Sequence, residues 1–410
     1  MRPLYTAAIS LYAAAVQAAA PFHGKARKMI DGRRSIDDVL REKIVPGARY
    51  VWLHAASLGE FEQGRPLLEA IRQRHPDYKI VLTFFSPSGY DVRRDYPGAD
   101  VVCYLPFDFP RRIRAFLDRV RPTLALFVKY EFWLNTLDEL RRRRVPTYLV
   151  SGIFRPGQFF FRPIGRPYRD ALRCFDHLFV QDETSRQLLA GIGLTNVTVT
   201  GDTRFDRVID IRHAARPLPV VAAFAERDAR PVLIAGSSWP EDEALLIPYF
   251  NAHPDLKLIL APHEIHEAHL AAIEARLTRP ALRLSHADAD TAAGADCLIV
   301  DSFGLLSSIY RYARIAYIGG GFGHGIHNAP EAAVYAVPVL FGPNHRKFRE
   351  ALDLIACGGA FSITDASTLA ACLDALLADP DACTAAGESA GAYIQQHSGA
   401  TEQILRAIGL

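Results

Sequence analysis

The sequence has no C-x-x-C pair, and most of its six cysteines lie inside apolar runs. Such spacing supports neither a zinc site nor a disulfide framework, and it fits buried thiols in a reducing cytoplasm. A surplus of charge is also missing, because 47 Lys and Arg stand against 45 Asp and Glu, for a net charge of +2. The sequence therefore gives no global electrostatic argument for a nucleic-acid partner.

Charged residues are absent from Pro3 to Gly24, and a basic cluster follows from Lys25 to Arg34. The uncharged run is long enough to reach across a bilayer, although it is rich in alanine rather than leucine. Because the basic residues follow this run, we expect an uncleaved membrane anchor that keeps the main body inside. A signal peptide cleaved near Ala18-Ala19-Ala20 and a buried helix are the alternatives. Residues 1–35 are assigned to the anchor and its basic flank.

The rest of the chain predicts an α/β protein with two lobes. From Tyr50 onward, short apolar runs alternate with helical patterns, which is typical of βαβ units and a mainly parallel sheet. A length of 410 residues exceeds one comfortable core. We assign 36–207 to the first Rossmann-like lobe, 208–230 to a linker, and 231–410 to the second lobe with the C-terminal helices. The last helix is expected to be able to pack back on the first lobe.

The expected strands can be placed from these apolar runs. Seven strands are predicted in the first lobe, at 51–55, 80–84, 101–105, 124–128, 147–150, 177–180 and 197–200. The second lobe is predicted to have strands at 231–236, 257–261, 297–301, 315–318 and 338–341.

Polar residues follow several of these strands. In parallel sheets the ligand crevice lies beyond the carboxyl ends of the strands, where helix N-termini attract anions. The spacings Ser57-x-x-Glu60, Ser238-x-x-Glu241 and Asn328-x-x-Glu331 are also those of helix caps. We favour a cap for Glu241. For Glu60 and Glu331 we expect a functional role as well, because glycines beside them permit close approach of a ligand.

The loop from Gly319 to His327 is predicted to cradle phosphate, because glycine removes side-chain bulk and a helix start follows. It matches neither G-x-x-x-x-G-K-[ST] nor a dinucleotide fingerprint, so a nucleoside monophosphate suits it better. Asp288-Ala-Asp290 has the D-x-D spacing that some transferases use for a metal, but it lies in an unpromising polar loop. The histidines lack mutual ligand spacing, so no metal site is expected.

Six motifs lie in order along the chain, most of them at strand ends. They are His54-Ala-Ala-Ser-Leu-Gly-Glu60, Ser86-Pro-Ser-Gly-Tyr90, Tyr130-Glu-Phe-Trp-Leu-Asn135, Gly201-Asp-Thr-Arg-Phe-Asp206, the segment that begins at Gly236, and Gly319 to Pro343. Taken in order, these motifs resemble the 3-deoxy-D-manno-octulosonic acid (Kdo) transferases over nearly the whole chain. The resemblance implies a GT-B fold whose two lobes face a central cleft. It also implies metal-independent, inverting transfer of Kdo from CMP-Kdo to the lipid A precursor, without a cofactor, by an enzyme anchored at the cytoplasmic face of the inner membrane.

The resemblance implies roles for individual residues. Glu60 matches the proposed general base, while Glu131 and Arg204 match positions assigned to transition-state stabilisation. The positions that match CMP-contacting segments are Pro262, His263, Gly304, Leu305, Leu306, Asn328, Ala329, Pro330 and Glu331.

Four of these positions depart from the commoner family pattern, in which arginine, glutamate and leucine stand at 263, 305 and 330, and lysine is frequent at 204. These departures put individual CMP contacts in doubt more than the reaction.

Two other functions compete with this interpretation. One is a different GT-B nucleotide-sugar transferase or epimerase that uses a uridine nucleotide, which the glycines alone do not exclude. The other is a non-enzyme, a periplasmic solute-binding protein with two α/β lobes and an N-terminal apolar segment.

Overall fold

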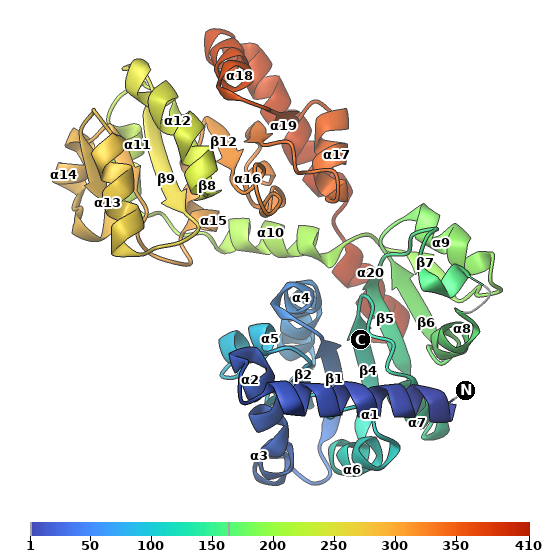
Figure 1. Ribbon diagram of the computed structural model, residues 1–410. Coiled ribbons are helices and arrows are strands. Elements are labelled where there is room, and N and C mark those ends of the chain that lie inside the picture. The colour runs from blue at the N-terminus through green and yellow to red at the C-terminus, as the bar shows by residue number, and fades with distance from the viewer. Residues whose placement is uncertain (1, 163–164) are drawn as a thin grey trace. The chain divides into compact units, whose positions relative to one another are not determined.

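The computed structural model describes residues 2–162 and 165–410, and the chain divides into two compact units (Figure 1). The N-lobe contains the residues up to Arg207 together with Ser398–Leu410, and the C-lobe contains Val208–His397. Each lobe is built on one seven-stranded parallel sheet. The expected α/β class, with two Rossmann-like lobes, is confirmed.

The N-lobe sheet has the strand order β3-β2-β1-β4-β5-β6-β7, which is a doubly wound arrangement. Apolar side chains are buried on both faces of its central strands, as expected for a parallel sheet covered by helices on both sides. The strands are β1 (Arg49–Ala55), β2 (Tyr78–Phe84), β3 (Val101–Tyr104), β4 (Pro122–Val128), β5 (Thr147–Gly152), β6 (His177–Val180) and β7 (Val197–Val199).

Helices cover both faces of this sheet. They are α1 (Arg2–Ala19), α2 (Gly24–Arg34), α3 (Ile36–Lys43), α4 (Leu58–Arg74), α5 (Pro87–Arg93), α6 (Pro110–Val120), α7 (Leu134–Arg142), α8 (Arg166–Leu172), α9 (Glu183–Ala190) and, from the end of the chain, α20 (Ala400–Ile408). A short 3-10 turn lies at Phe159–Phe161.

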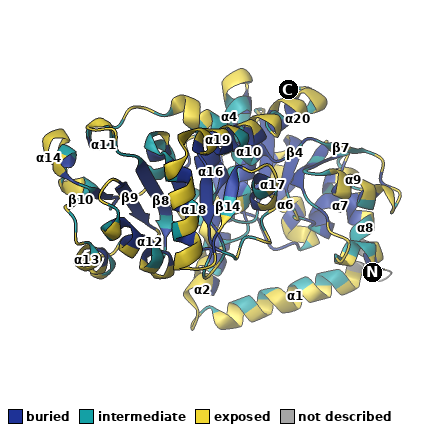
Figure 2. Cartoon of the chain, turned by 90° about the horizontal axis from the view of Figure 1, so that it is seen from above, coloured by how far each residue is buried: buried dark blue, intermediate teal, exposed yellow. Residues whose placement is uncertain are grey.

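The first helix is part of the N-lobe rather than a separate anchor. Among the residues that the structure describes, no helix has both the length and the apolar character needed to cross a bilayer. Figure 2 shows α1 along one side of the N-lobe, with much of its surface exposed. It is held there by the Tyr5 hydroxyl, which donates to Asp108 at 2.7 Å, and by Asn135, which donates to Thr6 at 3.2 Å. The expected spanning anchor is therefore not supported, because the alanine-rich run is too weakly apolar.

The C-lobe sheet has the order β10-β11-β9-β8-β12-β13-β14. Its core is formed by Leu and Ile side chains of the central strands and by the helices packed on them. The strands are β8 (Val232–Ser238), β9 (Lys257–Pro262), β10 (Ala281–Arg283), β11 (Cys297–Ile299), β12 (Ile315–Ile318), β13 (Val339–Phe341) and β14 (Ala360–Ser362). The short edge strands β10 and β14 are additions to the five expected from the sequence.

In the described part of the chain, ten helices lie between the last N-lobe strand and the end of the C-lobe, and the first of them, α10, begins in the N-lobe. They are α10 (Thr203–Ala214), α11 (Pro219–Glu226), α12 (Pro240–Ala252), α13 (Glu267–Arg276), α14 (Ala289–Gly294), α15 (Leu306–Ile309), α16 (Pro330–Ala333), α17 (Arg349–Ala356), α18 (Ala366–Ala378) and α19 (Pro380–Gln396). Two 3-10 turns lie at Leu284–His286 and Tyr310–Tyr312.

The structure differs from the sequence-based boundaries in two places. The stretch 208–230 was expected to be a linker, yet it contains most of α10 and all of α11 and belongs to the C-lobe. Val221 and Phe224 of α11 are buried, and Lys257 donates to the Phe224 carbonyl at 2.8 Å. At the other end, the second lobe was expected to run to residue 410, but α20 belongs to the N-lobe, where Ile404 and Leu405 enter the core. This position confirms that the last helix packs back on the first lobe.

Candidate functional site

Glu60 lies in the first turn of α4, directly after β1. Its half-buried carboxylate is close to the helix N-terminus, which favours negative charge. The Ser57 hydroxyl donates to this carboxylate and makes no hydrogen bond to the helix backbone. The Ser57 hydroxyl therefore orients the carboxylate of Glu60, and the two residues do not form a reciprocal capping box.

Glu131 lies in the loop after β4, and two side chains from other places hold it. Its Oε2 atom is 3.0 Å from His54 Nε2, and it accepts a hydrogen bond from Trp133 Nε1 at 2.7 Å. His54 is fully buried at the end of β1, where its Nδ1 atom contacts Thr83 Oγ1 at 2.9 Å. Only 12% of the Glu131 side chain is exposed, so the carboxylate is fixed in direction.

The same loop is also close to Glu60. Burial raises the pKa of Tyr130, and the negative charges of Asp182 and Glu60 raise it further. Lys129, which opens the loop, has a φ of +60°, in the left-handed region that non-glycine residues seldom adopt. Such strained positions cluster at functional sites because the surrounding structure must hold them in place. The strand end thus brings the Glu60 and Glu131 segments together.

Arg204 is oriented by a buried carboxylate. Its Nη2 atom is 2.8 Å from Asp202 Oδ2, and its backbone N–H donates to Oδ1 of the same residue at 2.9 Å. Gln63, one turn after Glu60 on α4, donates to both oxygens of Asp202 at 3.0 Å. This network connects the start of α10 to the helix that carries Glu60.

The charge state of Asp202 follows from these contacts. Burial alone would raise its pKa, but the charge of Arg204 and the hydrogen bonds from Arg204 and Gln63 outweigh burial and lower the pKa. Asp202 therefore stays ionised at neutral pH and fixes the guanidinium of Arg204, whose side chain is 30% exposed.

In the C-lobe, a buried aspartate holds the glycine-rich loop. Asp242 accepts hydrogen bonds from the Tyr317 hydroxyl at 2.7 Å, the Gly320 N–H at 2.8 Å and the Trp239 N–H at 2.9 Å. Gly320 has a φ of +89°, and a Cβ there would overlap the Gly325 carbonyl, so only glycine fits. Asp242 thus ties the start of α12 to the loop after β12.

An aromatic and imidazole stack lies beside this loop. The Trp239 ring stacks on His263 with centroids 4.7 Å apart, and its Nε1 atom donates to His327 Nε2 at 3.1 Å. His263 and His327 are 4.5 Å apart, and the His324 ring is 5.0 Å from Trp239. Burial and the neighbouring His263 lower the pKa of His327 to about 4, so His327 is neutral at physiological pH.

The remaining residues that were expected to contact CMP lie on two segments. Asn328 donates to Glu331 at 2.7 Å, and its buried Oδ1 atom has no hydrogen-bond partner among the described residues. Burial raises the pKa of Tyr310 well above its ordinary value, and the charge of Glu331 adds to that rise. A Cβ at Gly236 would overlap the Tyr310 hydroxyl and Leu306, so the end of β8, α15 and the Glu331 segment lie together.

The residues expected to contact CMP differ in burial and in the elements that carry them. Gly304 is exposed, whereas Leu305 and Leu306 are half-buried at the start of α15. Pro262 ends β9, with His263 directly after it. Ala329 and Pro330 are buried at the start of α16, where Glu331 occupies the first turn.

Two other acidic motifs have structural explanations. Glu241 was expected to be a helix cap, but α12 begins at Pro240 and Asp242 bonds to the cap backbone, while Glu241 is exposed. Asp288 caps α14 by accepting from the Thr291 N–H at 2.8 Å. Within 2–162 and 165–410, no group of three or more His, Cys, Asp or Glu side chains is arranged to hold a metal ion.

Sequence reasoning missed Asp202, Gln63, Trp239 and Asp242 as parts of the site. Asp242 offered a signal, because it stands three residues after Trp239, at the third position of a helix that starts at Pro240, where a capping acid is expected. The Gln63–Asp202 contact spans 139 residues of chain and leaves no local pattern.

The two parallel-sheet lobes define a GT-B-type architecture. Solved structures share it: the UDP-GlcNAc 2-epimerase from Neisseria meningitidis is 13% identical with a TM-score of 0.60, over 88% of this chain and 99% of that chain. A putative UDP-N-acetylglucosamine 2-epimerase from Listeria monocytogenes is also 13% identical, with a TM-score of 0.58, over 88% of this chain and 96% of that chain. At such identities the likeness concerns the fold alone.

Sequence comparison identifies the family. Residues 30–207 match the profile described as 3-deoxy-D-manno-octulosonic-acid transferase (kdotransferase). The 3-deoxy-D-manno-octulosonic acid transferase of Bordetella pertussis is 30% identical over 380 residues, which are 88% of this chain and 87% of that protein. The chain therefore belongs to the family of 3-deoxy-D-manno-octulosonic acid transferases and is a glycosyltransferase. This membership rules against the solute-binding alternative.

Proposed function

We propose that this chain transfers Kdo from CMP-Kdo to a hydroxyl of the lipid A precursor, with release of CMP, in lipopolysaccharide synthesis. Transfer is inverting and needs neither a metal nor a cofactor. The observation that carries the proposal is the oriented carboxylate of Glu60, set at a helix N-terminus near the Glu131 segment and linked through Gln63 and Asp202 to Arg204. Family membership supplies the reaction class.

The N-lobe residues fit the handling of a proton and of developing charge. As the acceptor oxygen bonds to the anomeric carbon of Kdo and the bond to CMP breaks, Glu60 takes the proton of the acceptor hydroxyl. The Arg204 guanidinium, fixed by Asp202, offsets negative charge on the carboxylate and phosphate of the donor. Glu131, held by His54 and Trp133, stabilises positive charge on the sugar ring in the transition state.

The C-lobe residues fit CMP. The N–H groups of the loop from Gly319 to His327 bind the phosphate, since glycine lets the backbone approach closely. The Glu331 carboxylate and the unpaired Asn328 Oδ1 accept hydrogen bonds from ribose hydroxyls. Pro262, His263 and the Gly304–Leu306 segment complete the nucleotide contacts. His263 is a stacked imidazole ring where arginine is commoner, so phosphate attraction depends more on backbone N–H groups.

We place the enzyme at the cytoplasmic face of the inner membrane, where the lipid acceptor is. The N-lobe supports this location through α1, whose described residues from Pro3 to Ala19 carry no charge and whose Leu4 and Leu11 side chains are 77% and 75% exposed. These exposed apolar side chains offer α1 a contact with the bilayer surface.

The test compares Glu60→Gln with Ser57→Ala in turnover of CMP-Kdo and lipid acceptor. An amide cannot accept the acceptor's proton, so Glu60→Gln should lower turnover by roughly 10²–10⁴-fold while the thermal unfolding midpoint stays close to that of the wild type. Ser57→Ala leaves the base but frees its carboxylate, so turnover should fall by less, roughly 10-fold, again with little change in stability.

Glu241→Gln is the matched control, because Glu241 also lies in the first turn of a helix but is exposed and outside the proposed chemistry. It should leave turnover unchanged. Near-normal turnover of Glu60→Gln would assign the base elsewhere, with Glu131 the next candidate.

A further inference from the structure

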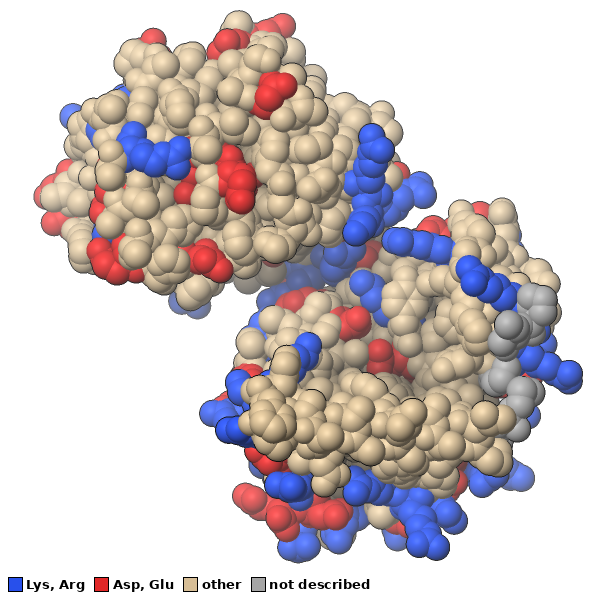
Figure 3. Space-filling view, viewed as in Figure 1, with Lys and Arg blue, Asp and Glu red and all other residues tan. Residues whose placement is uncertain are grey.

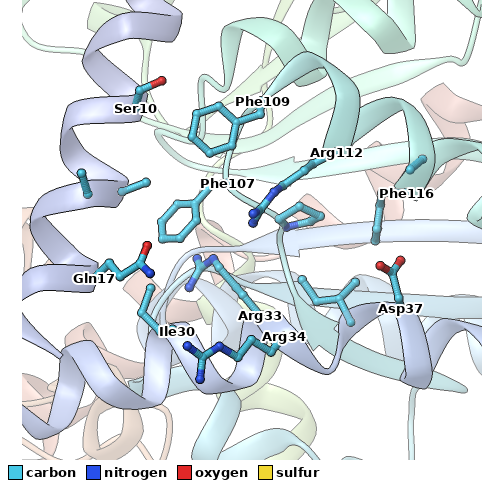
Figure 4. A pocket seen from close by; sticks show the side chains of 15 residues that line it. Ser10, Gln17, Ile30, Arg33, Arg34, Asp37, Phe107, Phe109, Arg112 and Phe116 are labelled. Atoms are coloured by element: carbon cyan, nitrogen blue, oxygen red, sulfur yellow. The ribbon is translucent and has the colours of Figure 1, made fainter. Parts of the chain in front are cut away.

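A cavity lies between α1 and the body of the N-lobe, apart from the residues assigned to sugar transfer. Its volume is about 590 Å³. Ala13, Ala14 and Gln17 of α1 form one wall, and the opposite wall carries Phe107, Arg33 and Arg112 (Figure 4). Small side chains on α1 leave this space open, while aromatic rings and guanidinium groups face it.

The cavity is positively charged. Figure 4 shows the guanidinium groups of Arg33 and Arg112 pointing toward one another. Among the described residues neither arginine has a carboxylate within ion-pair distance, although the exposed Asp37 is also on the cavity wall. Arg34, at the rim, is paired with Asp31 at 3.2 Å. Two like charges thus face one space without a neutralising partner.

Arg33 is unusual because its guanidinium is buried. Only 7% of the residue is exposed, and it lies 4.6 Å from the Phe85 ring centroid and 4.4 Å from that of Phe107. It donates to the Met29 and Phe85 carbonyls, yet its Nε atom has no partner within the described part of the chain. Burial lowers its pKa to about 10, and the charge of Arg112 contributes, so Arg33 stays cationic at neutral pH. A buried charge without a counter-ion is costly, which points to an anion that binds there.

The outer wall determines what kind of anion fits. The part of α1 that covers the cavity belongs to the run without charge from Pro3 to Ala19. Figure 3 shows this helix as a band free of Lys, Arg, Asp and Glu across the N-lobe. A ligand with a phosphate at one end and acyl chains at the other matches both walls.

We propose that this cavity binds the phosphate of an anionic bilayer phospholipid, whose acyl chains lie along α1. The planar guanidinium groups of Arg33 and Arg112 each offer parallel N–H donors to phosphate oxygens. The bound lipid supplies the missing counter-ion and fixes α1 to the bilayer surface. This site goes beyond sugar transfer, because it requires neither CMP-Kdo nor the acceptor.

The test measures binding of the full chain to phosphatidylcholine vesicles with and without phosphatidic acid, by co-sedimentation. Arg112→Gln is compared with Arg119→Gln, which removes an exposed charge from the last turn of the same helix but outside the cavity. Both variants lose the same general attraction to an anionic surface. Arg112→Gln should weaken binding to phosphatidic-acid vesicles by roughly 10-fold more than Arg119→Gln.

Three outcomes would overturn the proposal. Equal losses in the two variants would mean diffuse surface attraction, and equal binding to vesicles with and without phosphatidic acid would mean that no anion is recognised. Thermal stabilisation of the wild type by inorganic phosphate, lost in Arg112→Gln and without preferential vesicle binding, would assign the cavity to free phosphate. A failure of sugar transfer with intact vesicle binding would affect the proposed reaction alone.

Discussion

Tyr5→Phe tests whether α1 is an integral part of the N-lobe. The Tyr5 hydroxyl donates to Asp108, a carboxylate with no exposed surface, at 2.7 Å. Asp108 also accepts from the Asn135 N–H at 2.9 Å, and from the Thr136 N–H and hydroxyl at 2.9 and 2.6 Å, at the start of α7. Burial and the nearby carboxylate raise the pKa of Tyr5 far above its ordinary value, so the hydroxyl remains a donor at every working pH.

The expected loss follows from that single bond. A hydrogen bond to a charged group contributes about 1.5–3 kcal/mol, and phenylalanine removes it without leaving a large cavity. For a domain of this size each kcal/mol lowers the unfolding midpoint by about 2–4 °C. Tyr5→Phe should therefore lower the midpoint of the N-lobe transition by roughly 3–12 °C, measured by calorimetry of the full chain.

Tyr12→Phe is the control, because it makes the same chemical change on the same helix. Tyr12 is 42% exposed, and its ring stacks on Phe85 and meets Phe107 edge to face, contacts that phenylalanine preserves. The unfolding midpoint of Tyr12→Phe should stay within about 2 °C of that of the wild type. Equal midpoints for Tyr5→Phe and the wild type would refute the docking of α1 and restore the possibility that α1 is a detachable anchor.

Two further predictions concern metal and pH. Turnover should survive EDTA, because backbone N–H groups of the glycine loop suit phosphate without a cation; loss of turnover that magnesium or manganese restores would contradict this. The lowered pKa of His327, about 4, means that the unfolded chain takes up a proton on this side chain before the folded C-lobe does as pH falls. Stability should therefore decline as pH falls from about 6.5 to about 4, and thermal unfolding of His327→Gln at pH 4.5 and 7.5 should show a smaller difference than the wild type.

The sequence predicted the strands of both sheets where apolar runs are long. All seven N-lobe strands were expected, since each is an apolar or β-branched run that alternates with helical patterns. The edge strands Ala281–Arg283 and Ala360–Ser362 were missed because each has only three residues and neither forms a continuous run of buried apolar side chains. Strand order could not be derived, because pairing depends on contacts between distant segments.

The N-terminal segment shows a limit of reasoning from composition. An uncharged run of this length is compatible with a spanning helix, a signal peptide or a surface helix. The distinction depends on Tyr5 and Thr6, which make hydrogen bonds with Asp108 and Asn135, more than 100 residues away. The polar side chains of the run therefore attach α1 to the N-lobe, and mean hydropathy does not register such hydrogen bonds.

In the candidate site, too, features set by neighbouring residues could be predicted from the sequence, and contacts between distant residues could not. Glu60 could be singled out because the strand end, the glycine and the helix start are adjacent in sequence. Its partners could not: His54 and Glu131 are separated by 77 residues, and Gln63 and Asp202 by 139. In each pair an acidic group accepts hydrogen bonds from other side chains, Glu131 from Trp133 and Asp202 from Gln63 and Arg204, and these bonds fix the direction of the carboxylate. Because a buried carboxylate loses most when one donor is removed, such pairs stabilise the sheet edge and orient Glu131 and Arg204 at the same time. Fold and proposed chemistry therefore depend on the same hydrogen bonds, and a variant such as Asp202→Asn is expected to affect both.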